Sequence, residues 1–159
     1  MLAGVAPHHL DLLPRHAEDF RRHARDVDHE STPAQYLVRD RPDVARYLVD
    51  RGARTDLLLC AALGDLERVR RHLDDDPASA GITVSAKWLP MRDPRAGGHI
   101  YRWTLAAYAS PHRIAHEFGH AAVVALLFER SPADVALAAA CEIGDAVRAK
   151  AITASAAAT

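Results

Sequence analysis

The sequence contains only two cysteines, which excludes a framework of several disulfide bonds. Cys60 and Cys141 each lie in an alanine-rich segment, and neither has a second cysteine close by in the sequence. A zinc site built on a pair of neighbouring thiolates is therefore not expected either. We expect both thiols to be small buried side chains in a protein of a reducing compartment.

A strong net charge and a long apolar run are also missing. The chain has 20 basic and 21 acidic side chains, a formal net charge of -1, and the two signs are interleaved over residues 39–43. Nothing in this balance favours nucleic acid or an anionic membrane as a partner. No run approaches the roughly 18 apolar residues of a membrane span, and the start of the chain does not resemble a signal peptide. We therefore expect a cytoplasmic protein that binds neither nucleic acid nor membrane.

What the sequence does contain is typical of one globular domain. Apolar residues make up 49% of the chain and charged residues 26%, which are ordinary proportions. A chain of 159 residues is long enough to bury a core without disulfides or a metal ion. We expect a single domain over residues 1–150 and a flexible tail over the uncharged residues 151–159.

An internal repeat is visible in three segments. Each has a run of small, polar and apolar residues, followed by a glycine and then by Asp or His. Glycine suits a point where a helix ends and the chain reverses, because it tolerates a positive φ. The pattern thus predicts a first helix, a glycine turn and a second helix in each segment. The segments begin at Cys60, Ala115 and Ala140 and contain Gly64-Asp65, Gly119-His120 and Gly144-Asp145.

A fourth segment fits the same scheme with a shorter turn. Thr32-Pro33 has the residues of a helix start, since the hydroxyl can accept from free backbone amides and proline is pre-set for the first turn. Val44 and Leu48 follow at helical spacing, and Gly52 closes the second helix. One such pair of helices cannot bury its apolar face alone, so stacked pairs would share a core.

Taken together, TPAQYLV, VARYLVDRGA and GHAAVVALLFE resemble the ankyrin repeat, over roughly residues 30–150. The resemblance implies an all-α solenoid of stacked helix–turn–helix repeats with projecting loops, the repeats lying at about 30–53, 54–77, 100–130 and 131–150. In this family a histidine after the turn glycine ties the turn through hydrogen bonds, and an aspartate there could cap the second helix. The residues assigned to repeat turns are Thr32, Pro33, Gly52, Gly64, Asp65, Gly119, His120, Gly144 and Asp145.

The chain departs from the repeat pattern in several places. The first repeat has Arg41-Pro42 where the turn glycine belongs, and the second stops at residues 74–77. Residues 78–100 are rich in proline and glycine and are expected to form a projecting finger, followed by a helix that includes residues 105–107. Upstream, residues 11–26 have the pattern of an amphipathic helix that would cap the stack or be a remnant repeat.

A competing motif overlaps the third repeat. Residues 116–120, HEFGH, match the HExxH zinc signature. On one continuous helix, His116 and His120 would share a face and bind zinc, with Glu142 available as third ligand. Glu117 would then activate a bound water. The alternative hypothesis is therefore a zinc-dependent metallopeptidase.

The repeat alignment favours a structural role for the same residues. Glu142 is the counterpart of Glu117 in the next repeat. A helix that ends near Gly119 would carry His116 but not His120, which breaks the i, i+4 geometry. Short motifs also arise by chance. We therefore expect no metal, no cofactor and no catalysis, and the histidines without ligand spacing, His112 among them, are expected at the surface.

The finger carries the residue types that are enriched in binding hot spots, namely aromatic residues, methionine and arginine. Trp88 and Trp103 could equally fold back to fill the gap left by the irregular repeat. We expect a module that binds an unidentified protein, and a repeat scaffold without any partner surface remains a further alternative. The residues expected to contact the partner are Trp88, Met91, Arg92, Arg95, His99 and Tyr101.

Overall fold

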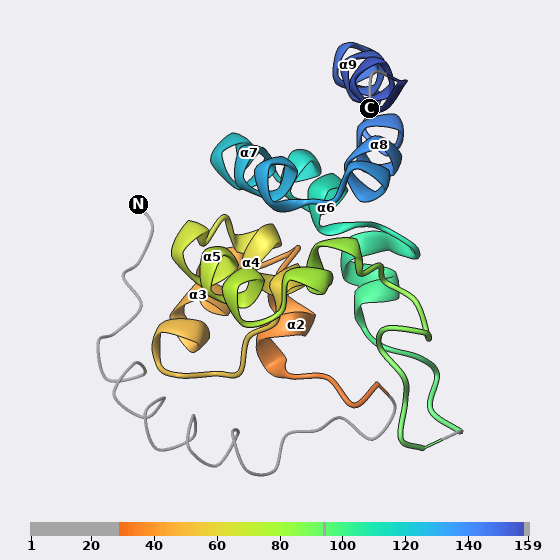
Figure 1. Ribbon diagram of the computed structural model, residues 1–159. Helices are drawn as coiled ribbons and strands as arrows, with labels where there is room; N and C mark the ends of the chain where they lie inside the picture. Colours follow the sequence, from red (N-terminus) through yellow and green to blue (C-terminus); the bar gives the residue numbers. More distant parts are fainter. Residues whose placement is uncertain (1–28, 94, 158–159) are drawn as a thin grey trace, which may run out of the picture.

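The computed structural model describes residues 29–93 and 95–157 (Figure 1). Over these residues the chain forms helices joined by turns and loops, and no β-strand occurs there. The all-α prediction is thus confirmed. None of the helices in this part of the chain is long and apolar enough to cross a membrane. The amphipathic helix expected at 11–26 lies outside the described residues.

Eight helices of the described chain form four consecutive pairs, and the two members of each pair contact each other. The second pair also contacts the third, through α4 and α6 and through α5 and α7, and the third pair contacts the fourth through α6 and α8. Short helices therefore lie side by side and share an interior. The pairs are α2 (Pro33–Leu37) with α3 (Pro42–Asp50), α4 (Leu57–Leu63) with α5 (Leu66–Asp75), α6 (Pro111–Glu117) with α7 (Ala121–Arg130), and α8 (Ala133–Glu142) with α9 (Ala146–Ala157).

Side-chain caps define where the first helix begins in each of the first three pairs. Thr32 forms a capping box with Gln35, in which each side chain bonds the other residue's amide, and Pro33 occupies the first turn of α2. Asp56 accepts from the amide of Leu59 at the start of α4, and Ser110 accepts from Arg113 at the start of α6. These polar residues before apolar runs satisfy amides that a helix leaves free.

Glycines in the left-handed conformation form the turns within the last three pairs. Gly64, Gly119 and Gly144 have φ values of 70°, 79° and 76°, where a side chain would be strained. Each turn contains the same hydrogen bond, from the amide after the glycine to the carbonyl five residues earlier, which is typical of a helix C-terminus. These bonds are Asp65 to Cys60 (3.0 Å), His120 to Ala115 (2.8 Å) and Asp145 to Ala140 (2.8 Å). One local geometry therefore recurs three times.

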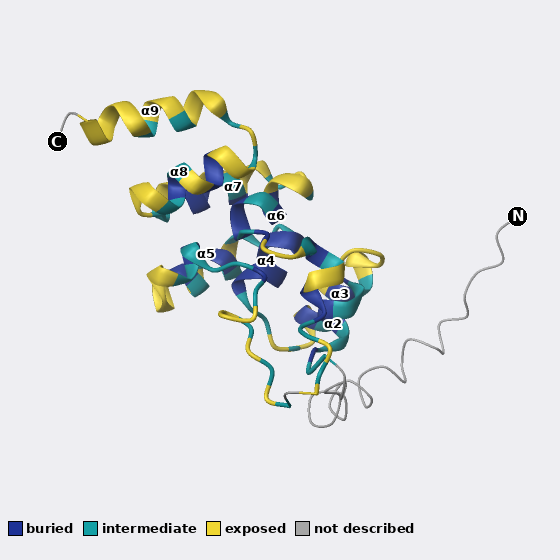
Figure 2. Cartoon of the chain, turned by 90° about the vertical axis from the view of Figure 1, so that its right-hand side faces the viewer, coloured by how far each residue is buried: buried dark blue, intermediate teal, exposed yellow. Residues whose placement is uncertain are grey.

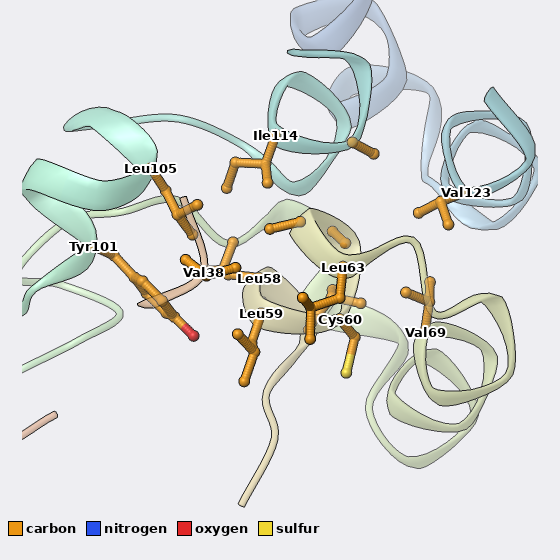
Figure 3. Packing of buried hydrophobic residues seen from close by; sticks show 14 of the residues in the cluster. Val38, Leu58, Leu59, Cys60, Leu63, Val69, Tyr101, Leu105, Ile114 and Val123 are labelled. Carbon is orange, nitrogen blue, oxygen red and sulfur yellow. The ribbon is translucent and has the colours of Figure 1, made fainter. Parts of the chain in front are cut away.

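Helix α4 lies at the centre of the core (Figure 2). All seven of its residues are buried, because LLLCAAL has no polar face and the helix packs against both α5 and α6. Figure 3 shows Leu58 and Leu59 among side chains from neighbouring elements, including Val38, Ile114 and Tyr101. Burying side chains of this size contributes about 2 kcal/mol each before entropy is counted.

A long connection separates the second and third pairs. It begins with η2 (Pro77–Gly81), continues through the finger and ends with the short π-type helix η3 (Arg102–Ala106). Two backbone bonds close its base, from Val84 to the carbonyl of Ala109 (3.1 Å) and from Tyr108 to the carbonyl of Val84 (2.9 Å). The third repeat was expected from residue 100, but its helix pair begins only at Pro111. A helix was expected to include residues 105–107; η3 ends one residue earlier, at Ala106.

The end of the described chain differs from the expected flexible tail. Helix α9 continues through Ala157, because alanine is the best helix former and six of its twelve residues are alanine. Its inner side packs on a small second cluster through Ala149 and Ile152, which lie against Phe128 and α8. The fourth pair therefore extends beyond residue 150.

The two cysteines lie in different environments, although both were expected to be buried. Cys60 is buried in α4, whereas Cys141 is exposed on α8. The small cluster that α8 forms with α9 occupies the side of the helix bearing Ala136, Ala139 and Ala140, so the next residue along points away from it. Burial, with the charge of Asp56 second, raises the pKa of the Cys60 thiol to about 12.

We expect a thiol reagent to distinguish the two cysteines. In the folded protein at pH 8, Ellman's reagent should modify Cys141 rapidly, because it is accessible. Cys60 should react only after denaturation, since it is enclosed and stays protonated. In the Cys141→Ser variant the fast phase should disappear. Fast reaction of one thiol in that variant would contradict the enclosed position of Cys60.

Candidate binding surface

Tyr101, the residue directly after the finger, anchors it in the core. Its side chain is fully buried, and its hydroxyl donates to Asp56 Oδ2 at 2.8 Å. The same carboxylate oxygen accepts from Gln35 Nε2 at 2.8 Å, so one aspartate joins the finger to the first two helix pairs. Figure 3 shows the ring of Tyr101 reaching toward Leu59. The expectation that Tyr101 contacts a partner is therefore wrong, because its polar group already has a partner inside the fold.

Sequence reasoning missed Asp56 and Gln35 as parts of this anchor. A signal was present for Asp56, since an aspartate directly before Leu57 and the apolar run that follows it is a typical helix N-cap. Nothing in the sequence pairs Asp56 with Tyr101, which lies 45 positions later.

A second anchor holds the outer part of the finger. Glu30 Oε1 accepts from the amides of both Arg92 and Asp93 at 2.8 Å. His29 Nδ1 lies 2.7 Å from the carbonyl oxygen of Gly98. Because these bonds involve backbone atoms of the finger, they fix the course of its main chain rather than the position of a single side chain. The finger is thus attached both at the core and along its length.

The tryptophans near this segment do not fill the gap before the third helix pair. Trp88 is 41% exposed and Trp103 57% exposed. The gap is filled by Ile100, Tyr101 and Leu105, all of which are buried. The idea that both tryptophans fold into the core is therefore wrong. Tyr108, 74% exposed, was not expected from the sequence and adds a third exposed aromatic side chain.

The other residues expected to contact a partner lie on or beside the same surface. Arg92 and Arg95 are exposed, and Met91 and His99 are half-buried. Arg95 is already paired with Asp93 at 2.8 Å, and that ion pair lowers the pKa of the aspartate. Burial lowers the pKa of His99, which favours a neutral imidazole.

A pocket of about 110 Å³ opens between residues 84–91 and residues 98–108 of the connection. Its wall includes apolar side chains such as Leu89 and Met91, together with His99, Arg102 and Tyr108. Val84, whose backbone closes the base of the connection, also lines it. The segment therefore offers a concave site beside exposed aromatic side chains.

The HEFGH residues do not share one helix. Helix α6 ends at Glu117, Gly119 has a φ of 79°, and His120 is the residue before α7. Glu117 is bound by Arg113 at 2.6 Å, and Glu142 accepts from the hydroxyl of Ser110 at 2.5 Å. Within residues 29–93 and 95–157, no three His, Cys, Asp or Glu side chains gather closely enough to hold a metal ion.

His120 instead connects the third helix pair to the second. Its Nε2 lies 2.9 Å from the carbonyl oxygen of Ala62, near the end of α4. Its ring lies so close to Gly64 that a Cβ on that glycine would be 2.5 Å from Nδ1. Gly64 is thus required twice, once for its positive φ and once for the space that His120 occupies.

The aspartates at the equivalent turns cap their second helices. Asp65 Oδ1 accepts from the amide of Arg68 at 3.0 Å, and Asp145 Oδ1 accepts from the amide of Arg148 at 2.9 Å. Histidine makes no such cap at residue 120 and serves the neighbouring pair instead. Gly52, at the end of α3, has a φ of 87°, as suits a helix end.

His112 lies in the core, although it was expected at the surface. It is fully buried, its Nε2 lies 3.0 Å from Ser131 Oγ, and its ring packs edge-on against Phe128 with 4.8 Å between centroids. Burial lowers its pKa to about 4. A signal existed, because Ser110-Pro111 repeats the Thr32-Pro33 helix start and places His112 on the inward side.

No protein-family model matches the chain, and no similar protein was found among curated proteins or among solved structures. A function is therefore inferred from the chain's own residues and geometry.

Replacing Tyr101 with phenylalanine should weaken the anchor of the finger. The half-buried Asp56 would lose one of its hydrogen bonds, and we expect the free energy of unfolding to fall by about 1–2 kcal/mol. Urea denaturation followed by circular dichroism measures this change. Tyr108→Phe is the matched control, since Tyr108 is 74% exposed and should be replaceable at almost no cost. Equal stability of the two variants would argue against the Asp56 anchor.

Proposed function

We propose that this chain is an ankyrin-type repeat module that binds another protein and performs no catalysis. The repeated turn, in which a left-handed glycine is followed by an amide bonded five residues back, supports the repeat assignment. The contacts of the second helix pair with the third and of the third with the fourth support stacking of the kind that such repeats use. A cytoplasmic location is part of the proposal, since both described cysteines are free.

The observation that carries the binding function is an anchored segment with exposed aromatic side chains. Trp88, Trp103 and Tyr108 are the large aromatic residues among the most exposed apolar side chains of the described chain. Exposed aromatics on a rigid segment are typical of interface hot spots, because little conformational freedom is lost on binding. The finger is held by Glu30 and by the Asp56–Tyr101 bond, which supplies that rigidity.

Affinity capture from the native cell extract tests the proposal. We expect the wild-type chain to retain a protein that the double variant Trp88→Ala, Trp103→Ala does not retain. Val147→Ala is the control, because Val147 is 82% exposed and lies on α9, away from the finger. Circular dichroism establishes that all three chains are folded. If the same proteins were captured by all three, the finger would not be the binding surface.

A further inference from the structure

The finger pocket has the volume for one side chain rather than for a whole ligand. It measures about 110 Å³, whereas pockets for drug-sized molecules hold about 300–1,000 Å³. An engineered apolar cavity of about 150 Å³ takes up benzene. An aliphatic side chain therefore fits best, and the contacts from Leu89 and Met91 suit it chemically.

The chain around the pocket is basic, although the protein as a whole has a net charge of -1. Residues 82–110 contain one acidic side chain, Asp93, which is bound to Arg95. The remaining cations of this stretch are Lys87, Arg92 and Arg102. None of these three has an ion pair with a carboxylate among the described residues, whereas arginines elsewhere, such as Arg68 and Arg130, do. Within the described residues, three cations without a carboxylate partner therefore lie in the stretch that forms a partly apolar pocket, and the nearby Glu30 carboxylate is already bound to the amides of Arg92 and Asp93.

We propose that the pocket binds an acidic peptide segment of the partner, with one aliphatic side chain of that segment inside it. Carboxylates on either side of the aliphatic residue would bond to Arg102 at the pocket wall and to Arg92 and Lys87 on the finger. This inference rests on the proposed protein-binding function and specifies the chemistry of the partner.

The arrangement of the aromatic rings favours a peptide over single-stranded nucleic acid. Bases stack on open ring faces. Here Lys87 Nζ lies over the ring of Trp88, 4.9 Å from its centroid, and His29 packs against Trp103 with 4.8 Å between ring centroids. Arg102 also lies 5.8 Å from the Trp103 centroid. These contacts already engage both tryptophan rings, and the pocket of about 110 Å³ is sized for an aliphatic side chain rather than for a base.

Tryptophan fluorescence can follow binding directly, because the chain has two tryptophans and both lie at this surface. We would titrate the full chain with capped Glu-Glu-Leu-Glu-Glu. Replacing the peptide's leucine by glycine should weaken binding by about tenfold or more, since the buried aliphatic contact is lost. A Gln-Gln-Leu-Gln-Gln peptide should also bind at least tenfold more weakly, and binding of the acidic peptide should decrease as salt is added.

Two variants test the two halves of the site. Ala107→Phe fills the pocket, which Ala107 lines, and Arg102→Gln removes a wall charge. Each should reduce the affinity for the acidic leucine peptide by tenfold or more. Arg54→Gln is the control, because Arg54 is exposed and lies outside residues 82–110. Circular dichroism checks that each variant is folded.

Three outcomes would overturn the inference. They are a lack of binding by the acidic leucine peptide, equal binding to the Ala107→Phe variant, and tighter binding of an oligothymidylate than of the peptide. If the peptides failed while capture from extract still required Trp88 and Trp103, only the acidic-peptide inference would be lost. If both failed, the binding function itself would be wrong.

Discussion

Acidification from pH 7 to pH 4 is expected to cost the folded protein about 3 kcal/mol through His112 alone. The unfolded chain has an ordinary histidine pKa near 6.5, whereas burial lowers the pKa in the fold to about 4. Between these values the unfolded chain binds a proton that the folded chain does not. The contribution of His112 to the free energy of unfolding is therefore fully present above about pH 6.5. It decreases as the pH falls toward 4 and levels off below pH 4.

Replacing His112 with glutamine should remove most of this loss. The variant would be less stable at pH 7, since the contact with Phe128 disappears, but its stability should change much less on acidification. Urea denaturation at several pH values measures the difference. His116→Gln, an exposed substitution on the same helix, should retain the wild-type dependence.

Carboxylates do not obscure this comparison. The amide and guanidinium of Arg148 lower the pKa of Asp145, so its contribution is lost at still lower pH and is common to all three proteins. If wild type and His112→Gln lost stability in parallel between pH 7 and pH 4, the burial of His112 would be contradicted.

Gly64→Ala is expected to destabilise the protein by about 2–3 kcal/mol, the second of the two largest effects. About 1 kcal/mol comes from placing alanine at a φ of 70°. The rest arises because the new Cβ would lie 2.5 Å from His120 Nδ1, so that the ring must move and the bond to the Ala62 carbonyl is lost. Chemical denaturation reports the change in free energy.

Gly119→Ala is the matched control for this prediction. Gly119 occupies the same turn position with a φ of 79°, but nothing lies within 4 Å of its Cβ position. We expect a cost of about 1 kcal/mol, from backbone strain alone. The difference between the two glycines isolates the contact with His120.

A double-mutant cycle makes the same contact measurable in a second way. With His120→Ala already present, Gly64→Ala should cost only the strain, about 1 kcal/mol, because the ring is gone. A coupling of about 1–2 kcal/mol between residues 64 and 120 should result. Additive effects would show that His120 does not occupy the space above Gly64.

This contact also bears on the zinc signature at 116–120. The sequence contains the residues that a zinc helix needs, but Gly119 takes a left-handed conformation and ends the helix. His120 then lies in the turn and faces Ala62 of the preceding helix pair. Residue types at the right spacing are thus insufficient, because the i, i+4 relation holds only within one helix.

Local features of this protein could be predicted from its sequence. The helix start at Thr32-Pro33 and the turn glycines Gly64, Gly119 and Gly144 were identified, and the structure has a helix cap and left-handed turns there. These features depend on residues within about one turn of each other, so proximity in sequence is proximity in space. The same holds for the caps at Asp65 and Asp145.

The environments of single side chains were predicted less well. Tyr101 was assigned to the surface but is bonded to Asp56, His112 was assigned to the surface but lies against Phe128, and Cys141 was assigned to the core but is exposed. The exposed Tyr108 and the pocket beside it were missed. For Tyr101 and His112 a neighbour far along the chain decides the environment.

The sequence by itself determined that this chain forms short helices in pairs, the last three of which are joined at glycines that accept a positive φ. Only the tertiary structure decided which aromatic and histidine side chains are buried, and where the finger's pocket opens. The physical reason is the range of the interactions: caps and turns are set by adjacent residues, whereas burial depends on contacts such as Asp56 with Tyr101 and Ala62 with His120, which exist only once the helix pairs have packed.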